Sequence, residues 1–241
     1  MPSLIYGRNS VIAAITSSRV KKIMVSDSFK DQRILSLAND LHIPLTRVST
    51  AKLNELVHSN NHQGVIAEAK DYQYYSLMDL INEGKKVSCP TIVMLDGIED
   101  PHNLGAILRI VDAFNAVGII LRKTSQVQLN ATVDKVSTGA INYVKVAQVS
   151  NLNVAIKKLK EEGYWIIATD GSAKDSYLKL DYNMPTVIII GSEANGISNL
   201  VKTNSDFLVK IPMYGHVNSL NASNALSVIL AHITHLKHSP R

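Results

Sequence analysis

Residues 211–230 read IPMYGHVNSLNASNALSVIL, which predicts a strand end, a glycine turn and then an apolar helix. Asn218, Ser219, Asn221 and Ser223 crowd the turn where the helix should begin. Ser and Asn are favoured at helix N-caps because their side chains accept hydrogen bonds from free backbone N–H groups. The stretch therefore predicts either a well-capped helix or a pocket wall, since ligands of α/β sheets bind at strand-to-helix junctions.

The composition of the whole chain is that of a globular protein. Its 241 residues are enough for two domains, and 46% of them are hydrophobic against 19% charged. The one cysteine, Cys89, excludes an internal disulfide and favours a reducing, cytoplasmic setting. No apolar run is long enough to span a membrane, and the first residues lack the apolar core of a signal peptide.

Residues 1–70 are predicted to form a small α/β sandwich in which short helices alternate with strand-like runs. This segment holds nine Lys or Arg against five Asp or Glu, so it carries +4 of the total net charge of +5. Such a surface can contact RNA phosphates, although charge alone favours an ordinary solvated surface. The basic residues in question are Arg8, Arg19, Lys21, Lys22, Lys30, Arg33 and Arg47.

The composition changes after this segment. Residues 71–90 read as a linker with one short helix, which opens with a capping-box pattern at Ser76 and Asp79. From residue 91 to 241, continuous apolar strands alternate with helices, and the run 186–190 is nearly all β-branched. Strands buried on both faces predict a mostly parallel sheet with helices on its faces.

Two further strand-to-helix junctions carry polar residues. One places Asn103 near the start of a predicted helix and Arg109 further in, among apolar neighbours. An Arg in such company is costly unless it meets an anion or a carboxylate, and a structural salt bridge is the simpler explanation. The other, GSEANG at 191–196, lets a ligand approach the backbone at its glycines and adds Glu193, although a plain turn also explains it.

The three stretches together resemble the motifs of the SpoU/TrmH family, which are S-adenosylmethionine-dependent RNA ribose 2′-O-methyltransferases. The matching residues occur in family order over residues 91–236: Asn103-x-Gly105-x-x-x-Arg109, Gly191-x-Glu193-x-x-Gly196, and Ile211-Pro212-Met213 with Ser219-Leu220-Asn221. Ile5-Tyr6-Gly7 and His62-Gln63-Gly64-Val65 are similar to the substrate-binding domain of the RlmB-type members, which modify a guanosine of 23S ribosomal RNA. Ala194 and His216 depart from that type, where glycine and serine are usual.

The resemblance implies a SPOUT-type fold with a trefoil knot near the C-terminal end, and a homodimer. The cofactor S-adenosylmethionine would be bound by Thr169, Gly171, Gly191, Gly196, Ile211, Met213 and Leu220. The catalytic set would be Arg109, Asn103, Glu193, Ser219 and Asn221. It also favours RNA binding by Arg8, Lys21, Lys22, Arg33 and Arg47. Because a guanidinium is a poor base, we expect Arg109 to bind the substrate phosphate and to stabilise the developing alkoxide.

Two alternatives stay open. One is a ribose methyltransferase that acts on tRNA, and the other is a non-catalytic RNA-binding α/β protein. The presence of every polar motif residue argues against the second. We expect no metal site, because the recurrence of His232, His235 and His238 near the chain end reads as a solvated helix face.

Overall fold

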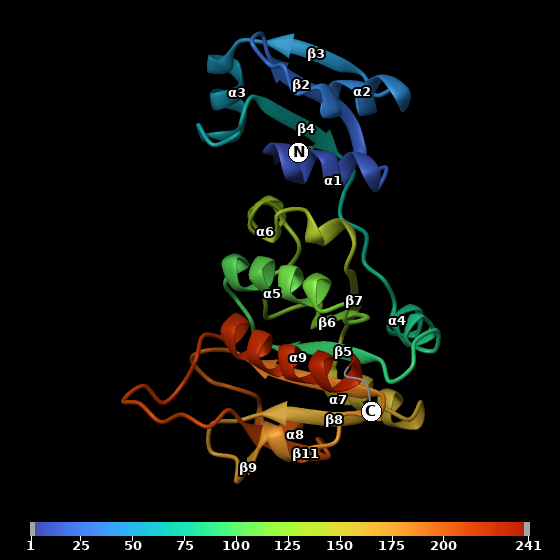
Figure 1. The fold of residues 1–241 in the computed structure, drawn as a ribbon, viewed down its shortest axis with the longest axis vertical. Coiled ribbons are helices and arrows are strands. Elements are labelled where there is room, and N and C mark those ends of the chain that lie inside the picture. Colours follow the sequence, from blue (N-terminus) through green and yellow to red (C-terminus); the bar gives the residue numbers. More distant parts are fainter. Residues whose placement is uncertain (1–2, 239–241) are drawn as a thin grey trace. The chain divides into compact units, whose positions relative to one another are not determined.

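The structure is a computed structural model that describes residues 3–238, with side chains from residue 4 to 237, and these residues divide into two compact units. Unit 1 contains residues 3–73 and 129–143, and unit 2 contains residues 74–128 and 144–238 (Figure 1). The excursion at 129–143 interrupts the chain of unit 2 and adds a helix to unit 1. No local sequence pattern predicts that residues 129–143 belong to unit 1, because this depends on contacts between residues distant in sequence.

Unit 1 is built on a four-stranded mixed sheet with the order β1-β4-β2-β3. The strands are β1 (Ser3–Tyr6), β2 (Val20–Ser26), β3 (Leu45–Val48) and β4 (Val65–Ala69). β4 pairs antiparallel with β1 and with β2, while β2 and β3 are parallel. The helices are α1 (Arg8–Thr16), α2 (Gln32–Asp40), α3 (Thr50–Val57), and α6 (Ala131–Ser137) from the excursion. Strand β1 has four residues, too few for a periodicity to reveal it from sequence.

Unit 2 is built on a seven-stranded sheet with the order β7-β6-β5-β10-β8-β11-β9, in which every described pairing is parallel. The strands are β5 (Thr91–Asp96), β6 (Gly118–Arg122), β7 (Lys145–Val149), β8 (Trp165–Thr169), β9 (Asp175–Ser176), β10 (Thr186–Gly191) and β11 (Phe207–Lys210). The helices are α4 (Leu77–Gly84), α5 (Pro101–Ala113), α7 (Leu152–Glu161), α8 (Asn199–Thr203) and α9 (Ala222–His238). Within residues 3–238, no helix is long and apolar enough to cross a membrane.

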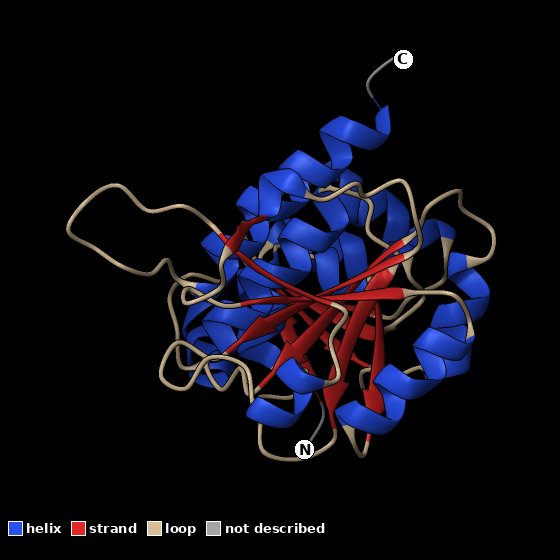
Figure 2. Ribbon diagram, turned by 90° about the horizontal axis from the view of Figure 1, so that it is seen from below, coloured by secondary structure: helices blue, strands red, loops and turns tan. Residues whose placement is uncertain are grey.

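The mostly parallel sheet expected from the apolar strands is therefore present. β5 is buried along its whole length, and β10 is buried up to its last residue, as their continuous apolar sequences predict. The loop between β11 and α9 projects from this sheet and is the long loop at the left of Figures 1 and 2. It carries the sequence 211–221, in which the strand-to-helix junction was expected.

Helix α4 lies in the segment read from sequence as a linker. The capping box is present: Asp79 N donates to Ser76 Oγ at 3.1 Å, and Ser76 N donates to Asp79 Oδ2 at 2.9 Å. Hydrogen bonds from Ser76 hold the pKa of Asp79 below its usual value. Leu80 and Ile81 are fully buried in the core of unit 2. Residues 77–84 are therefore part of the folded unit and not a free connector.

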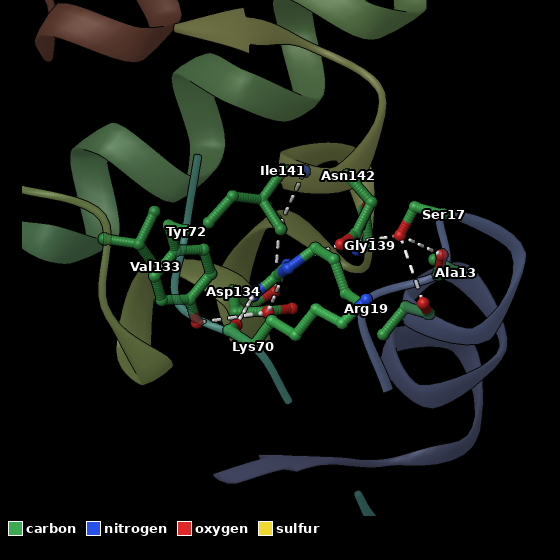
Figure 3. A network of polar contacts seen from close by, with 12 residues as sticks. Ala13, Ser17, Arg19, Lys70, Tyr72, Val133, Asp134, Gly139, Ile141 and Asn142 are labelled. Carbon is green, nitrogen blue, oxygen red and sulfur yellow. Dashed lines mark hydrogen bonds and ion pairs between the residues drawn. The ribbon is translucent and has the colours of Figure 1, made fainter. Parts of the chain in front are cut away.

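A buried ion pair fastens the excursion into unit 1 (Figure 3). Arg19 Nη1 lies 3.6 Å from Asp134 Oδ2, donates to Asn142 Oδ1 at 2.5 Å, and its guanidinium carbon is 4.2 Å from the centre of the Tyr72 ring. Tyr72 donates its hydroxyl to Asp134 Oδ2 at 3.2 Å. Burial raises the pKa of Asp134 to about 6, against the opposing effects of Arg19 and Tyr72. Arg19, considered for phosphate contact from its charge, is instead 13% exposed and committed to this network.

Candidate active site

A cavity of about 420 Å³ opens at the carboxyl ends of β8, β10 and β11. Parallel sheets bind ligands at this edge because the loops that follow the strands diverge there. The wall contains every residue that was proposed from sequence for the cofactor, namely Thr169, Gly171, Gly191, Gly196, Ile211, Met213 and Leu220. It also contains Glu193, Ser219 and Asn221 of the proposed catalytic set.

The turn after β10 explains the two glycines at 191 and 196. Ser192 N donates to the Gly196 carbonyl at 3.2 Å, and Gly196 N donates to the Ser192 carbonyl at 2.9 Å. A Cβ on Gly191 would overlap the backbone of Gly196. Gly196 itself has a φ of 63°, in the left-handed region. Gly191 therefore lets the chain fold back on itself, whereas the sequence had suggested close approach by a ligand.

Asp96, at the end of β5, anchors the same turn and was not singled out from sequence. Its side chain is 5% exposed, accepts Ser198 N at 2.8 Å through Oδ2, and lies 3.4 Å from Arg122 Nη2 through Oδ1. Its carbonyl accepts Ser192 N at 3.1 Å. An aspartate that ends a fully buried strand is the signal that points to such an anchor.

Three polar side chains from separate strand-to-helix junctions meet beside the cavity. Helix α5 begins with Asp100 as its cap, which accepts His102 N at 2.8 Å, and this start places Asn103 in the first turn. Asn103 Nδ2 donates to Glu193 Oε1 at 3.0 Å. Asn221 Nδ2 donates to Asn103 Oδ1 at 2.9 Å and also to Glu193 Oε1. We call Asn103, Glu193 and Asn221 the polar cluster.

Asn221 also caps helix α9, as the polar run at 218–223 had suggested. Its Oδ1 accepts Ser223 N at 2.9 Å and Ser223 Oγ at 2.6 Å. The stretch is therefore both a capped helix start and part of the pocket wall. The side-chain oxygen of Asn221 caps the helix, and its side-chain nitrogen donates to the polar cluster.

A second carboxylate, Asp170, fixes the turn after β8. It accepts Ser172 N at 2.8 Å and Ser172 Oγ at 2.6 Å, and it forms an ion pair with Lys202. The hydrogen bonds from Lys202 and Ser172 lower its pKa to about 2. Asp170 lines the cavity and was not proposed from sequence, although it lies directly after Thr169 at a strand end.

Apolar side chains complete the wall. Met213 is 37% exposed and Leu220 is 38% exposed, and both come from the projecting loop. Exposed apolar side chains beside backbone polar groups and carboxylates are typical of a site for an organic ligand with apolar and charged parts.

Arg109 lies away from the cavity. It is exposed on α5 and has no hydrogen bond or ion pair within residues 3–238. Its apolar neighbours Ile107 and Leu108 are fully buried, whereas Arg109 is exposed, and the structural salt bridge that was the simpler explanation is not formed within residues 3–238. Arg109 is six residues beyond Asn103, which is about 9 Å along the helix and on a different side of it. Within one chain, Arg109 therefore does not contact the polar cluster.

The basic residues proposed for RNA are dispersed over unit 1. Lys22 pairs with Glu68 at 2.8 Å, and Arg8 Nε lies 3.6 Å from Asp31 Oδ2. Arg47 Nη1 donates to three backbone carbonyls of the turn after β2, those of residues 26, 27 and 29. Lys21 and Arg33 have exposed side chains.

His232 differs from its expected place on a solvated face. Its ring makes edge contacts with Tyr177 and Tyr182, with centroids 5.2 and 5.9 Å away, and burial lowers its pKa. The side chain of His238 lies outside the described residues.

Comparisons with known proteins identify relatives of both units. Residues 90–231 match the SpoU rRNA methylase family, and residues 4–75 match a family described as RNA 2′-O ribose methyltransferase substrate binding. A Bacillus subtilis protein named for the TrmH family of tRNA/rRNA methyltransferases is 41% identical over 94% of this chain and 92% of its own. A Staphylococcus saprophyticus protein named for the same family is 43% identical over 94% of this chain and 93% of its own.

Solved structures share the fold. The SpoU methyltransferase AviRb from Streptomyces viridochromogenes, in complex with the cofactor AdoMet, has a TM-score of 0.82 at 22% identity and covers 99% of this chain and 91% of its own. An AdoMet-bound rRNA methyltransferase from Sinorhizobium meliloti has the same TM-score and identity, and covers 99% of this chain and 88% of its own.

Proposed function

The chain belongs to the SpoU rRNA methylase family, and we propose on that basis that it transfers a methyl group from S-adenosylmethionine to a ribose 2′-hydroxyl of RNA. The observation that carries the proposal is the convergence of three strand-to-helix junctions at one cavity, where the polar cluster adjoins the wall that contains the family's cofactor positions. A non-catalytic RNA-binding protein does not need that convergence.

The residues present fit S-adenosylmethionine. Met213 and Leu220 offer apolar surface that is exposed in the structure, and the strand ends at 169–171 and 190–192 line the same cavity. The carboxylate of Glu193 suits a cationic ligand. When bound, S-adenosylmethionine supplies a methyl group on a positively charged sulfur, which is a good methyl donor.

Within the polar cluster, Glu193 is the residue best placed to handle the ribose hydroxyl. Its Oε1 accepts the two amide N–H groups of Asn103 and Asn221, whereas Oε2 has no hydrogen-bond partner among the described residues. A carboxylate held through one oxygen presents the other in a fixed direction, which favours accepting the proton or the hydrogen bond of a hydroxyl. Ser219, on the same wall, adds a hydroxyl without a described partner.

Arg109 binds a phosphate of the RNA and stabilises the developing alkoxide in this proposal. Because Arg109 has no hydrogen bond or ion pair among the described residues and does not reach the polar cluster of its own chain, we propose that it acts at the cavity of a second copy in a homodimer. Its exposure on α5 is what supports that placement.

The substrate that we propose is a guanosine of 23S ribosomal RNA. The match of residues 4–75 to a substrate-binding family supports a large RNA with a second contact region, as do the RlmB-type motifs at residues 5–7 and 62–65. The relatives' names include both tRNA and rRNA, so tRNA is the second candidate. Transfer of labelled methyl to purified 23S rRNA and to total tRNA separates the two, and label in tRNA alone would reverse the choice. The trefoil knot remains a prediction from the family.

A further inference from the structure

Unit 1 contains a second cavity, of about 600 Å³, which we call the unit 1 cavity. Its wall comes from four parts of the chain: the start of α1, the turn after β2, the first turns of α3, and the turn before β4. All of these lie within residues 8–64, so the methyl-transfer site does not use them. Sites for small organic ligands measure about 300–1,000 Å³, a range that includes room for one nucleotide.

His62 sets the direction of the hydrogen bonds in this wall. The ring is 3% exposed, and its Nδ1 accepts Gly64 N at 2.9 Å, so Nε2 carries the proton and donates to Asn54 Oδ1 at 2.7 Å. The amide oxygen of Asn54 is thereby occupied. Its Nδ2 has no acceptor within residues 3–238, so Asn54 contributes N–H donors to the cavity wall.

Gln63 is arranged in the same way. Its Oε1 accepts Arg8 N at 2.8 Å, and its Nε2 has no acceptor among the described residues. The turn that presents it is tight, with φ values of 54° at Gln63 and 79° at Gly64. A Cβ on Gly64 would approach the Phe29 ring to 3.1 Å, so the turn is packed against the opposite wall. Two amide groups thus have their oxygens satisfied internally and their donors unused.

The wall of the unit 1 cavity also carries a net positive charge. Arg8 and Lys30 face one carboxylate, Asp31, which leaves a net positive charge. Asp31 and the Phe29 ring, 5.7 Å from the guanidinium carbon, hold the side chain of Arg8, yet 52% of it stays exposed. Its Nη groups have no partner within residues 3–238.

A wall of amide, guanidinium and ammonium donors recognises a ligand with many acceptor oxygens. We propose that the unit 1 cavity binds one unpaired nucleotide of the RNA substrate, with its phosphate at Arg8 and Lys30 and a base carbonyl at Asn54 and Gln63. Duplex RNA does not fit, because its bases are stacked and their edges are paired. The inference rests on the proposed function in taking RNA as the ligand, and it assigns recognition to a site distant in sequence from the chemistry.

The variant Asn54→Asp tests the inference at one atom. It keeps the acceptor for His62 and replaces the Nδ2 donor by an anionic oxygen. Asn39→Asp is the matched control, since Asn39 is exposed at the end of α2 and lies outside the cavity wall. The probe is a fluorescein-labelled single-stranded RNA of about twelve nucleotides and mixed sequence, and its duplex, measured by fluorescence anisotropy with the full chain.

We expect the wild-type protein to bind the single strand more tightly than the duplex, and Asn54→Asp to weaken that binding about tenfold or more. Asn39→Asp should change it less than about twofold. Equal losses in the two variants, tighter binding of the duplex, or no binding of the single strand would overturn the inference. Calorimetry with S-adenosylmethionine on the same samples separates this from the proposed function, because Asn54→Asp should bind the cofactor as the wild type does. A wild-type protein that does not bind S-adenosylmethionine would contradict the proposed methyltransferase function, but it would not contradict nucleotide binding in the unit 1 cavity.

Discussion

Asn221 donates its amide N–H to Asn103 Oδ1 at 2.9 Å, a contact between residues 118 positions apart in the sequence. The same side chain accepts Ser223 N at 2.9 Å through Oδ1 and so begins helix α9. The start of the C-terminal helix and the start of α5 are therefore held together at Glu193. The geometry of the polar cluster depends on helix capping as well as on the cluster's own hydrogen bonds.

Asn221→Asp should separate these two roles. The aspartate keeps the acceptor for Ser223, but it removes the donor to Asn103 and places a second carboxylate beside Glu193. We expect methyl transfer to fall about a hundredfold or more, and unfolding free energy to change by about 1 kcal/mol or less. Single-turnover transfer from labelled cofactor and urea unfolding measure the two. Asn224→Asp, on the same helix and outside the cavity wall, is the control; comparable losses in both variants would contradict the assignment.

Mixing two inactive variants should show whether Arg109 acts in a second copy. Arg109→Ala and Glu193→Gln are each expected to lose methyl transfer. If Arg109 serves the partner's site, a mixed dimer has one site with both defects and one intact site. Mixing equal amounts after reversible dissociation should then restore about a quarter of wild-type activity. No recovery, although mass spectrometry shows that mixed dimers form, would mean that Arg109 and Glu193 of the same chain act in one site, and it would contradict the placement of Arg109 in a second copy.

Gly191→Ala should damage the cofactor site through the backbone. The added methyl would overlap the carbonyl of Gly196 and open the turn that follows β10. We expect the affinity for S-adenosylmethionine to fall about tenfold or more, and the rise in Tm on adding cofactor to shrink accordingly. Gly215→Ala is the matched control, since an added Cβ there meets nothing within 4 Å. An unchanged calorimetric affinity in Gly191→Ala would show that the turn is not part of the binding site.

Asp134 should give the protein a pH-dependent stability. Because burial raises its folded pKa to about 6, the folded state keeps a proton that the unfolded chain releases near pH 4. The contribution of Asp134 to the free energy of unfolding is therefore present below about pH 4 and declines as the pH rises to about 6, by about 2 kcal/mol. Urea unfolding of the wild type and of Asp134→Asn between these pH values measures it. The variant should lack this decline, and parallel profiles would contradict the buried-carboxylate account.

Much of the fold of unit 2 could be predicted from sequence because its strands are fully buried. A strand such as 186–190 has no polar face, so its continuous apolar run is distinctive. The short strands β1 and β9 lack that signal. Residues 129–143 belong to unit 1 through long-range contacts, among them those of α6 with β1 and the ion pair between Arg19 and Asp134. Neither Arg19 nor Asp134 reveals in the sequence a partner more than a hundred positions away.

The candidate site was predicted as a set of residues more fully than as a geometry. The motif positions predicted which residues line the cavity, but they predicted no distances between them. They also did not reveal that Arg109 is exposed and lies apart from Glu193. Asp96 and Asp170 were not proposed because strand-end aspartates are common and their partners, Ser198 and Lys202, are distant in sequence. Arg47 read as a basic surface residue, since the carbonyls that it binds belong to a turn that the pattern does not locate.

The most direct test of the central claim is to map ribose methylation after incubating the purified protein with S-adenosylmethionine and 23S rRNA from cells that lack it. The account predicts one 2′-O-methylated guanosine that appears only with cofactor and is absent with Glu193→Gln. Methylation on a base, or no methylation of any RNA by a protein that binds the cofactor, would contradict it.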